Sequence, residues 1–175
     1  MNQVNVPCLP QLDAVPEAVI LLASRGKPRC HGEDEVFQIT PMVPVDCEAV
    51  LRLWESVDGI AVLPDVDTPE YLCRFLQRNP GCSFVARCET RLVGAILGGH
   101  DSRRGFLYHM AVVPAHRGRG VGRALAERCL GALRAAGIRK VHLFVFSDND
   151  AARTFWAHIG FRERTDIAPM SITLA

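Results

Sequence analysis

The sequence lacks both a charge excess and a long hydrophobic run. Its 20 Lys and Arg residues against 19 Asp and Glu residues give a formal net charge of +1, and such a balance argues against a broad nucleic-acid-binding face. The longest early apolar run, residues 18–23, is only six residues long, too short for a membrane span or for the apolar part of a secretory leader. We therefore expect a cytoplasmic protein with neither a nucleic acid nor a membrane as its partner.

A clustered set of metal ligands is missing as well. The seven cysteines and six histidines are scattered along the chain, and no C-x-x-C pair occurs. A structural zinc site needs Cys and His ligands at characteristic close spacings. The sequence therefore predicts no metal, and it predicts that the cysteines are reduced thiols in the core.

The composition that remains is typical of one globular domain. Hydrophobic residues make up 49% of the 175 and charged residues 22%, and a chain of this length can bury roughly two-thirds of its unfolded surface. Residues 1–34 are expected to form an N-terminal extension, with a short helix over about 14–24 or a strand over 19–22 as alternatives. Residues 35–175 are expected to form the domain.

The chain is organised around a Gly- and Arg-rich turn between a predicted strand and a predicted helix. Residues 106–113 are a mostly apolar run rich in aromatic and β-branched types, typical of a strand buried on both faces, and Pro114 ends it. Apolar residues then recur at three- and four-residue spacing from Val121 to Leu133, which predicts a helix that Gly137 closes. Three glycines lie where the strand meets the helix: Gly118, Gly120 and Gly122.

This junction suits a phosphate group. The first N–H groups of a helix lack internal partners and carry the positive end of the helix dipole, and glycines let a bulky anion reach them. Arg117, Arg119 and Arg123 add positive charge with no acid between them. A P-loop is excluded because Arg-Ala follows Gly122, and no third glycine completes G-x-G-x-x-G. The pattern that remains is R-x-x-G-x-G, on Arg117, Gly120 and Gly122.

Together with a second block, this pattern resembles the GNAT superfamily, the GCN5-related N-acetyltransferases. Residues 149–161 are similar to that family's N-x-x-A-x-x-x-Y-x-x-x-G-F signature and match it everywhere except at the tyrosine, where Trp156 stands. The resemblance covers roughly residues 36–174. It implies an acyl-CoA N-acyltransferase that uses acetyl-CoA as its co-substrate.

The order of the predicted elements agrees with the fold that the resemblance implies. That fold is α/β, with a mixed, mostly antiparallel central sheet flanked by helices in a single domain. The expected elements are strand 36–39, helices 44–59 and 68–79, hairpin 82–99, central strand 106–113, helix 121–136, strand 140–146, helix 150–158 and outer strand 170–174.

The resemblance also implies how the chain would bind acetyl-CoA. In the family the central strand splays from the next strand and its free backbone groups bind the pantetheine arm, a role that falls here on Met110, Ala111 and Val112. Asn149 would hydrogen-bond the same arm, and from the sequence alone it is also a good cap for the following helix. The diphosphate would lie on the turn, at Arg117, Gly118, Arg119, Gly120, Val121 and Gly122.

The groups that carry protons are less clearly marked. By the resemblance, the usual tyrosine acid falls at Trp156 and the glutamate base of some members falls at Phe106, and neither side chain ionises usefully. Tyr108 and His109 are the catalytic candidates instead. Neighbouring residues of a regular strand face opposite sides, so only one of the two can line the site. By the resemblance, the side of the strand that faces the coenzyme is that of Phe106, Tyr108 and Met110, which favours Tyr108. A plain core role is the alternative for both residues.

The predicted function is an N-acetyltransferase in which a primary amine attacks acetyl-CoA directly within a ternary complex. The acceptor would be a small-molecule or peptide amine next to the loop 60–67, whose Asp65 and Asp67 either face a cation or are simply solvated. His158 and water are further candidates for proton transfer. The alternative is a CoA-binding sensor or partner protein with weak or no activity, and a homodimer is left open.

Overall fold

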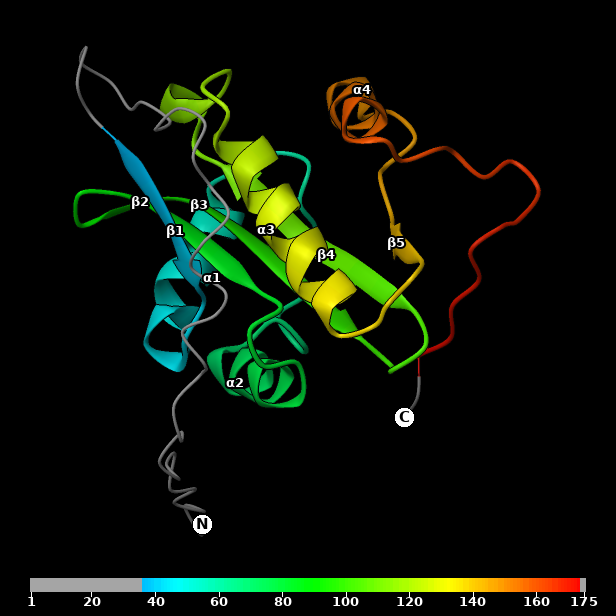
Figure 1. Cartoon of the computed structure of the whole chain (residues 1–175), viewed down its shortest axis with the longest axis horizontal. Helices are drawn as coiled ribbons and strands as arrows, with labels where there is room; N and C mark the ends of the chain where they lie inside the picture. Colours follow the sequence, from blue (N-terminus) through cyan, green and yellow to red (C-terminus); the bar gives the residue numbers. More distant parts are fainter. Residues whose placement is uncertain (1–35, 174–175) are drawn as a thin grey trace, which may run out of the picture.

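The computed structural model describes residues 36–173. The predicted N-terminal extension, with its alternatives of a helix or a strand, lies outside the described residues. Within them, five strands form one open sheet with helices on both faces (Figure 1). In chain order the elements are β1 (Phe37–Pro41), a 3-10 turn η2 (Pro44–Asp46), α1 (Cys47–Glu55), α2 (Pro69–Arg78), β2 (Phe84–Cys88), β3 (Arg91–His100), β4 (Gly105–Val112), a 3-10 turn η3 (Pro114–His116), α3 (Val121–Ala135), β5 (Val141–Leu143) and α4 (Asp150–Ile159).

The strands lie side by side in the order β1-β2-β3-β4-β5, which is also their order along the chain. Neighbours pair antiparallel from β1 to β4, whereas β4 and β5 run parallel. A parallel pair needs a long crossover connection, and α3 supplies it. The predicted α/β fold with a mixed, mostly antiparallel sheet is confirmed.

Helices α1 and α2 cover one face of the sheet. The apolar side of α1 is buried, with Val50 and Trp54 fully enclosed, and it packs in one cluster with strand residues such as Val85. Helix α2 begins as predicted, because Thr68 accepts a hydrogen bond from Tyr71 N at 3.4 Å and the proline at its first position needs no such bond.

Helix α3 covers the opposite face, and α4 joins the same core. The stripe predicted for α3 is enclosed, since Leu125, Cys129 and Leu133 have no exposed surface. Burial of such side chains stabilises the fold by about 1.5–3 kcal/mol for each leucine. Helix α4 contributes less to this core, because Trp156 is its one buried residue.

The structure differs from the sequence-based expectation at two strands. β5 ends at Leu143 instead of residue 146, and both Phe144 and Phe146 are mostly exposed. The predicted outer strand is wrong for the part that the structure describes, since residues 170–173 pair with none of the described strands and Met170 is 96% exposed. A further strand would have to pair with the edge of β5, and an edge of three residues is too short for stable pairing.

The described residues contain neither a helix long and apolar enough to cross a membrane nor a cluster of three His, Cys, Asp or Glu side chains able to hold a metal. The cysteines agree with the prediction in part. Cys47, Cys73, Cys82 and Cys129 are free thiols. Cys88 is disulfide-bonded, so the prediction of reduced thiols is wrong there. Spacing along the chain does not say which sulfur atoms the fold brings together.

Candidate active site

β4 and β5 pair over only three positions before they separate. The paired residues are Gly105 with Val141, Phe106 with His142, and Leu107 with Leu143. On its other side, β4 stays bonded to β3 as far as Val112. The β5-facing edge of residues 108–112 therefore has no neighbouring strand in the described part of the chain, which is the splay that the cofactor prediction requires.

The separation opens a cavity of about 700 Å³. One wall is the edge of β4, the opposite wall is made by residues 143–146 and α4, and the turn before α3 forms a third side. The predicted cofactor-binding residues that line it are Met110, Ala111, Val112, Arg117, Gly118, Gly120, Gly122 and Asn149. Arg119 and Val121 are not among the lining residues. The Val121 side chain lies in the core, so its possible contribution is the backbone N–H.

The turn before α3 presents an uncapped helix N-terminus. Gly120 is the N-cap residue with φ +83°, and Gly118 has φ +74°, a left-handed conformation that favours glycine. No described side chain caps this helix and its first turn holds no acid, so its first N–H groups are available to an anion. A Cβ on either glycine would meet no described atom within 4 Å, so the space beside the turn is open.

Two arginines add positive charge beside this helix N-terminus. Arg117 donates from Nε to Val112 O at 3.0 Å, which holds its guanidinium next to the turn. Arg123 donates from Nε to Glu127 Oε1 at 2.9 Å in an exposed pair one turn apart. Helix N–H groups, open space and guanidinium groups together suit a polyphosphate.

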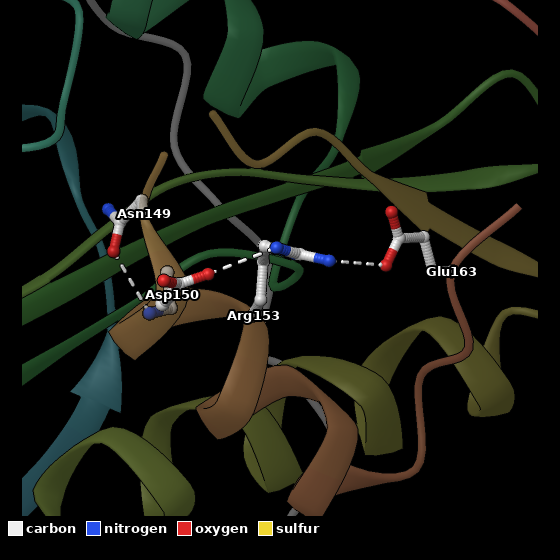
Figure 2. A network of polar contacts seen from close by, with 5 residues as sticks. Asn149, Asp150, Arg153 and Glu163 are labelled. Carbon is white, nitrogen blue, oxygen red and sulfur yellow. Dashed lines mark hydrogen bonds and ion pairs between the residues drawn. The ribbon is translucent and has the colours of Figure 1, made fainter. Parts of the chain in front are cut away.

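Asn149 lies where the cavity meets the start of α4. Its Oδ1 accepts a hydrogen bond from Ala152 N at 3.0 Å, so it is the N-cap of the helix (Figure 2). Its Nδ2 faces Gly59, because a Cβ on that glycine would lie 2.6 Å from it. The side chain thus caps the helix with its oxygen, and its N–H groups are the donors that it can offer to a ligand.

Arg153 ties the start of α4 to the segment that follows the helix (Figure 2). Its guanidinium contacts Asp150 Oδ1 at 3.0 Å and Glu163 Oε2 at 2.9 Å. Exposed ion pairs of this kind contribute little stability, although an acid in the first turn suits the positive end of the helix dipole. The contacts orient this wall of the cavity more than they strengthen it.

A β-bulge in β4 turns Tyr108 and His109 toward the same face of the sheet. The register with β3 slips between Ala95 and Leu97, which pair with Ala111 and Tyr108, and His109 takes a left-handed φ of +39°. An extra residue on one strand interrupts the alternation of faces. The prediction that only one of the two residues can line the site is therefore wrong, and both line the cavity.

Tyr108 packs among aromatic rings on the face covered by α1 and α2. Its ring lies 5.8 Å from that of Phe75 in an edge arrangement and 6.0 Å from that of Phe106. Burial, and after it the negative charge of Asp101, raises the pKa of Tyr108. The phenol is therefore protonated at neutral pH, as a proton donor must be.

His109 is held between α1 and the loop before α2. Its ring centroid lies 4.8 Å from that of Trp54, and its Nε2 lies 3.2 Å from Asp67 Oδ2. The sequence raised the possibility that Asp67 faces a cationic acceptor, but in the structure it contacts His109, whereas Asp65 is exposed. No sequence pattern marks this pair, because 42 positions separate the residues and the bulge brings them together.

Neither the residue at the family's tyrosine position nor the further candidate His158 is placed for proton transfer. Trp156 is buried between Phe155 and Phe161, with ring centroids 5.0 and 5.3 Å away, and part of it lines the cavity. His158 is exposed, its Nδ1 bonds to Thr154 O at 2.7 Å, and it is not a lining residue. Of the candidates named from the sequence, Tyr108 and His109 thus line the cavity at the splay, together with the carboxylate of Asp58.

Known proteins resemble this chain in sequence. The profile described as the acetyltransferase (GNAT) family matches residues 49–161. An acetyltransferase of Pectobacterium atrosepticum is 41% identical over 107 residues, which cover 61% of this chain and 74% of the relative.

Solved structures resemble the chain in fold. Ard1 from Thermoplasma volcanium is 26% identical, with a TM-score of 0.64, over 72% of this chain and 82% of that one. Rv2747 from Mycobacterium tuberculosis, solved in complex with CoA and NLQ, is 23% identical, with a TM-score of 0.60, over 78% of this chain and 76% of that one. At that identity the second likeness concerns the fold alone.

Proposed function

Because the chain belongs to the acetyltransferase (GNAT) family, we propose that it moves the acetyl group of acetyl-CoA to a primary amine by direct attack within a ternary complex. That it is an acyl-CoA-dependent acetyltransferase follows from the family and from its acetyltransferase relative. Direct attack requires that the thioester and the amine are held together, an oxyanion is stabilised, one proton is removed and one is returned.

The cavity supports a binding mode for acetyl-CoA along its length. Residues 117–122 would hold the diphosphate, through the helix N–H groups, including that of Val121, and the charges of Arg117 and Arg119. The free edge of residues 110–112 would bind the pantetheine arm together with Asn149, and one of its N–H groups would face the thioester oxygen. When bound, acetyl-CoA supplies an activated acetyl group.

The bulge is the observation that supports the roles in proton transfer. His109 takes the proton from the amine, since an imidazole can accept a proton near neutral pH. Tyr108 returns a proton to the departing thiolate, and its raised pKa keeps the phenol protonated for that step. Both side chains line the same cavity, and the proposal requires that one bound acetyl group lies within reach of both.

The acceptor we propose is a small-molecule or peptide amine of lowered pKa, such as an α-amine. An alkylamine with a pKa near 10.4 is about one part in a thousand neutral at pH 7, a handicap of about 4–5 kcal/mol. An α-amine with a pKa near 8 has a handicap of about 1.4 kcal/mol. A neutral imidazole is a weak base and suits the second kind of amine better.

The test is acetyl-CoA turnover over a panel of amines at pH 7, followed by release of the CoA thiol and by mass spectrometry of the product. We expect amine-dependent release and a higher kcat/KM for an α-amino amide than for the ε-amine of an α-blocked lysine. Non-ionisable residues at positions 106 and 156 favour the rival function, a CoA-binding sensor. Calorimetric binding of acetyl-CoA without transfer to any amine would support that rival.

Three further expectations stay predictions. They are the cytoplasmic location, the division between an N-terminal extension and a domain at residue 35, and the homodimer. Fractionation of cells, limited proteolysis and light scattering of the full chain would test them in turn. None of them changes the chemistry proposed for the cavity.

A further inference from the structure

We propose that Asp67 is a positioning residue for the proton transfer, because its carboxylate fixes both the orientation and the tautomer of His109. This inference rests on the proposed function, in which His109 accepts the proton of the amine. It is carried by three contacts: the hydrogen bonds that hold Asp67, the contact between Asp67 and His109, and the packing of His109 on Trp54.

Asp67 is itself held by reciprocal hydrogen bonds with Leu63. Leu63 N donates to Asp67 Oδ2 at 2.8 Å, and Asp67 N donates to Leu63 O at 2.7 Å. The Asp67 side chain is only 12% exposed. A carboxylate that attracts a solvated cation would lie in the open, as that of Asp65 does. The loop therefore presents Asp67 to the protein interior, where His109 is its partner.

The orientation of His109 is also fixed by a ring contact and by its own backbone conformation. The Trp54 ring lies 4.8 Å from the imidazole at an interplanar angle of 60°, and Trp54 has no exposed surface. The backbone of His109 has a φ of +39°. Such a conformation costs energy in a residue other than glycine and persists where its surroundings enforce it, often at functional sites. The ring therefore has a defined direction before any ligand binds.

The contact with Asp67 decides which ring nitrogen is free. An ionised carboxylate only accepts hydrogen bonds, so Nε2, at 3.2 Å from Oδ2, is the nitrogen that carries the hydrogen. Nδ1 is then left with the lone pair that takes a proton. Without the carboxylate either nitrogen can carry the hydrogen, and part of the population would present an N–H group to the amine.

Proton uptake turns the contact into an ion pair. An imidazolium beside a carboxylate is stabilised by the opposite charge. Asp67 is the charged side chain in contact with the ring in the described part of the chain, since Trp54 of α1 is uncharged and Tyr108, the neighbour on β4, is a protonated phenol. Asp67 thus sets the orientation of His109 and is the partner of the ring when it carries the proton.

The test compares Asp67→Asn with Asp65→Asn. The second substitution removes the same charge from the same loop, but at an exposed residue rather than at the partner of His109. We expect Asp67→Asn to lower kcat about ten-fold or more. Asp65→Asn should leave kcat unchanged. Asp67→Glu keeps a carboxylate and should restore part of kcat.

Two results would overturn the inference. A rise in KM alone, shared by Asp65→Asn, would assign Asp67 to the attraction of a cationic acceptor. A fall in kcat with an unchanged His109 tautomer, accompanied by a lower melting temperature, would restrict Asp67 to its hydrogen bonds with Leu63.

A measurement without turnover separates this inference from the proposed function. Long-range ¹H–¹⁵N spectra should show His109 as the Nε2–H tautomer in the unmodified chain, and in Asp67→Asn a mixture of the two tautomers. If those spectra change as expected but no amine is acetylated, the proposed function fails and the positioning contact stands. If the enzyme is active and the spectra do not change, the positioning inference alone fails.

Discussion

Gly120 and Gly137 flank helix α3 with almost the same left-handed φ, +83° directly before its first residue and +81° two residues after its last. A Cβ on either glycine would meet no described atom within 4 Å. Gly120 lies in the wall of the cavity and Gly137 does not. The two positions therefore differ in their relation to a ligand while they share the same backbone strain on substitution.

We predict that Gly120→Ala and Gly137→Ala cost similar stability, about 1–2 kcal/mol each, because both place an L side chain in the left-handed region. Only Gly120→Ala should weaken acetyl-CoA binding, by about ten-fold or more, since its Cβ occupies the space through which a phosphate reaches the helix N–H groups. Calorimetry and urea unfolding measure the two effects. Equal acetyl-CoA affinities in the two folded variants would contradict the proposal that the diphosphate binds at this turn.

Asn149 allows its two roles to be separated by the choice of replacement. Asn149→Ser keeps an oxygen that can accept from Ala152 N, so its stability should be close to that of the unmodified chain, while Asn149→Ala should lose about 1 kcal/mol. Both variants lack the amide N–H donors and should bind acetyl-CoA about 2- to 10-fold more weakly. An affinity lost only in Asn149→Ala would mean that the residue is a helix cap alone.

Tyr108→Phe should lower kcat by about 10²-fold and leave acetyl-CoA affinity unchanged, because phenylalanine keeps the ring contacts with Phe75 and Phe106 but cannot donate a proton. Burial raises the pKa of Tyr108 above its usual value of 10.0. The phenol therefore stays protonated, and the unmodified enzyme should show no loss of activity from this residue below about pH 10. Unchanged turnover in Tyr108→Phe, with a rise in Trp156→Tyr, would move the acid to position 156.

Cys129 should make the protein lose stability in alkali. Burial raises the pKa of its thiol from 9.0 to about 12, so between those values the unfolded chain releases a proton that the folded chain keeps. The free energy of unfolding should then fall by about 1.4 kcal/mol per pH unit from this thiol. Its contribution is complete below pH 9 and declines above it. Urea unfolding of Cys129→Ala between pH 8 and 10.5 should give a correspondingly shallower slope, and parallel slopes would contradict the assignment.

Local patterns in the sequence were sufficient to predict most of the fold. The helix spacing of Leu125, Cys129 and Leu133 agrees with their complete burial, and the glycines before α3 have the positive φ values that their position in a tight turn suggests. These features depend on neighbours within one or two turns of the same element. A short stretch of consecutive residues is therefore enough to predict them.

The face of the sheet that Tyr108 and His109 share could not be predicted in the same way. The bulge lies at His109, a residue with no preference for positive φ strong enough to reveal it, and it arises from the pairing of β3 with β4. Strict alternation therefore assigned Tyr108 and His109 to opposite faces. Asp67 reaches His109 through a loop whose path depends on the whole α1 and α2 layer. Contacts of this range are set by tertiary packing, which periodicity does not record.

Three ladder pairs join β5 to the rest of the sheet, and α4 adds a single buried side chain, Trp156. The two walls of the cavity therefore belong to regions of unequal local stability. Amide hydrogens of α4 should exchange with solvent through partial opening, whereas those of α3 should exchange only when the whole domain unfolds. A ligand that bonds to both walls would supply contacts in place of the hydrogen bonds that β4 and β5 do not make beyond their three paired positions. Saturation with acetyl-CoA should slow hydrogen exchange in α4 far more than in α3. The wall that α4 forms would then reach its full stability only while the co-substrate is bound.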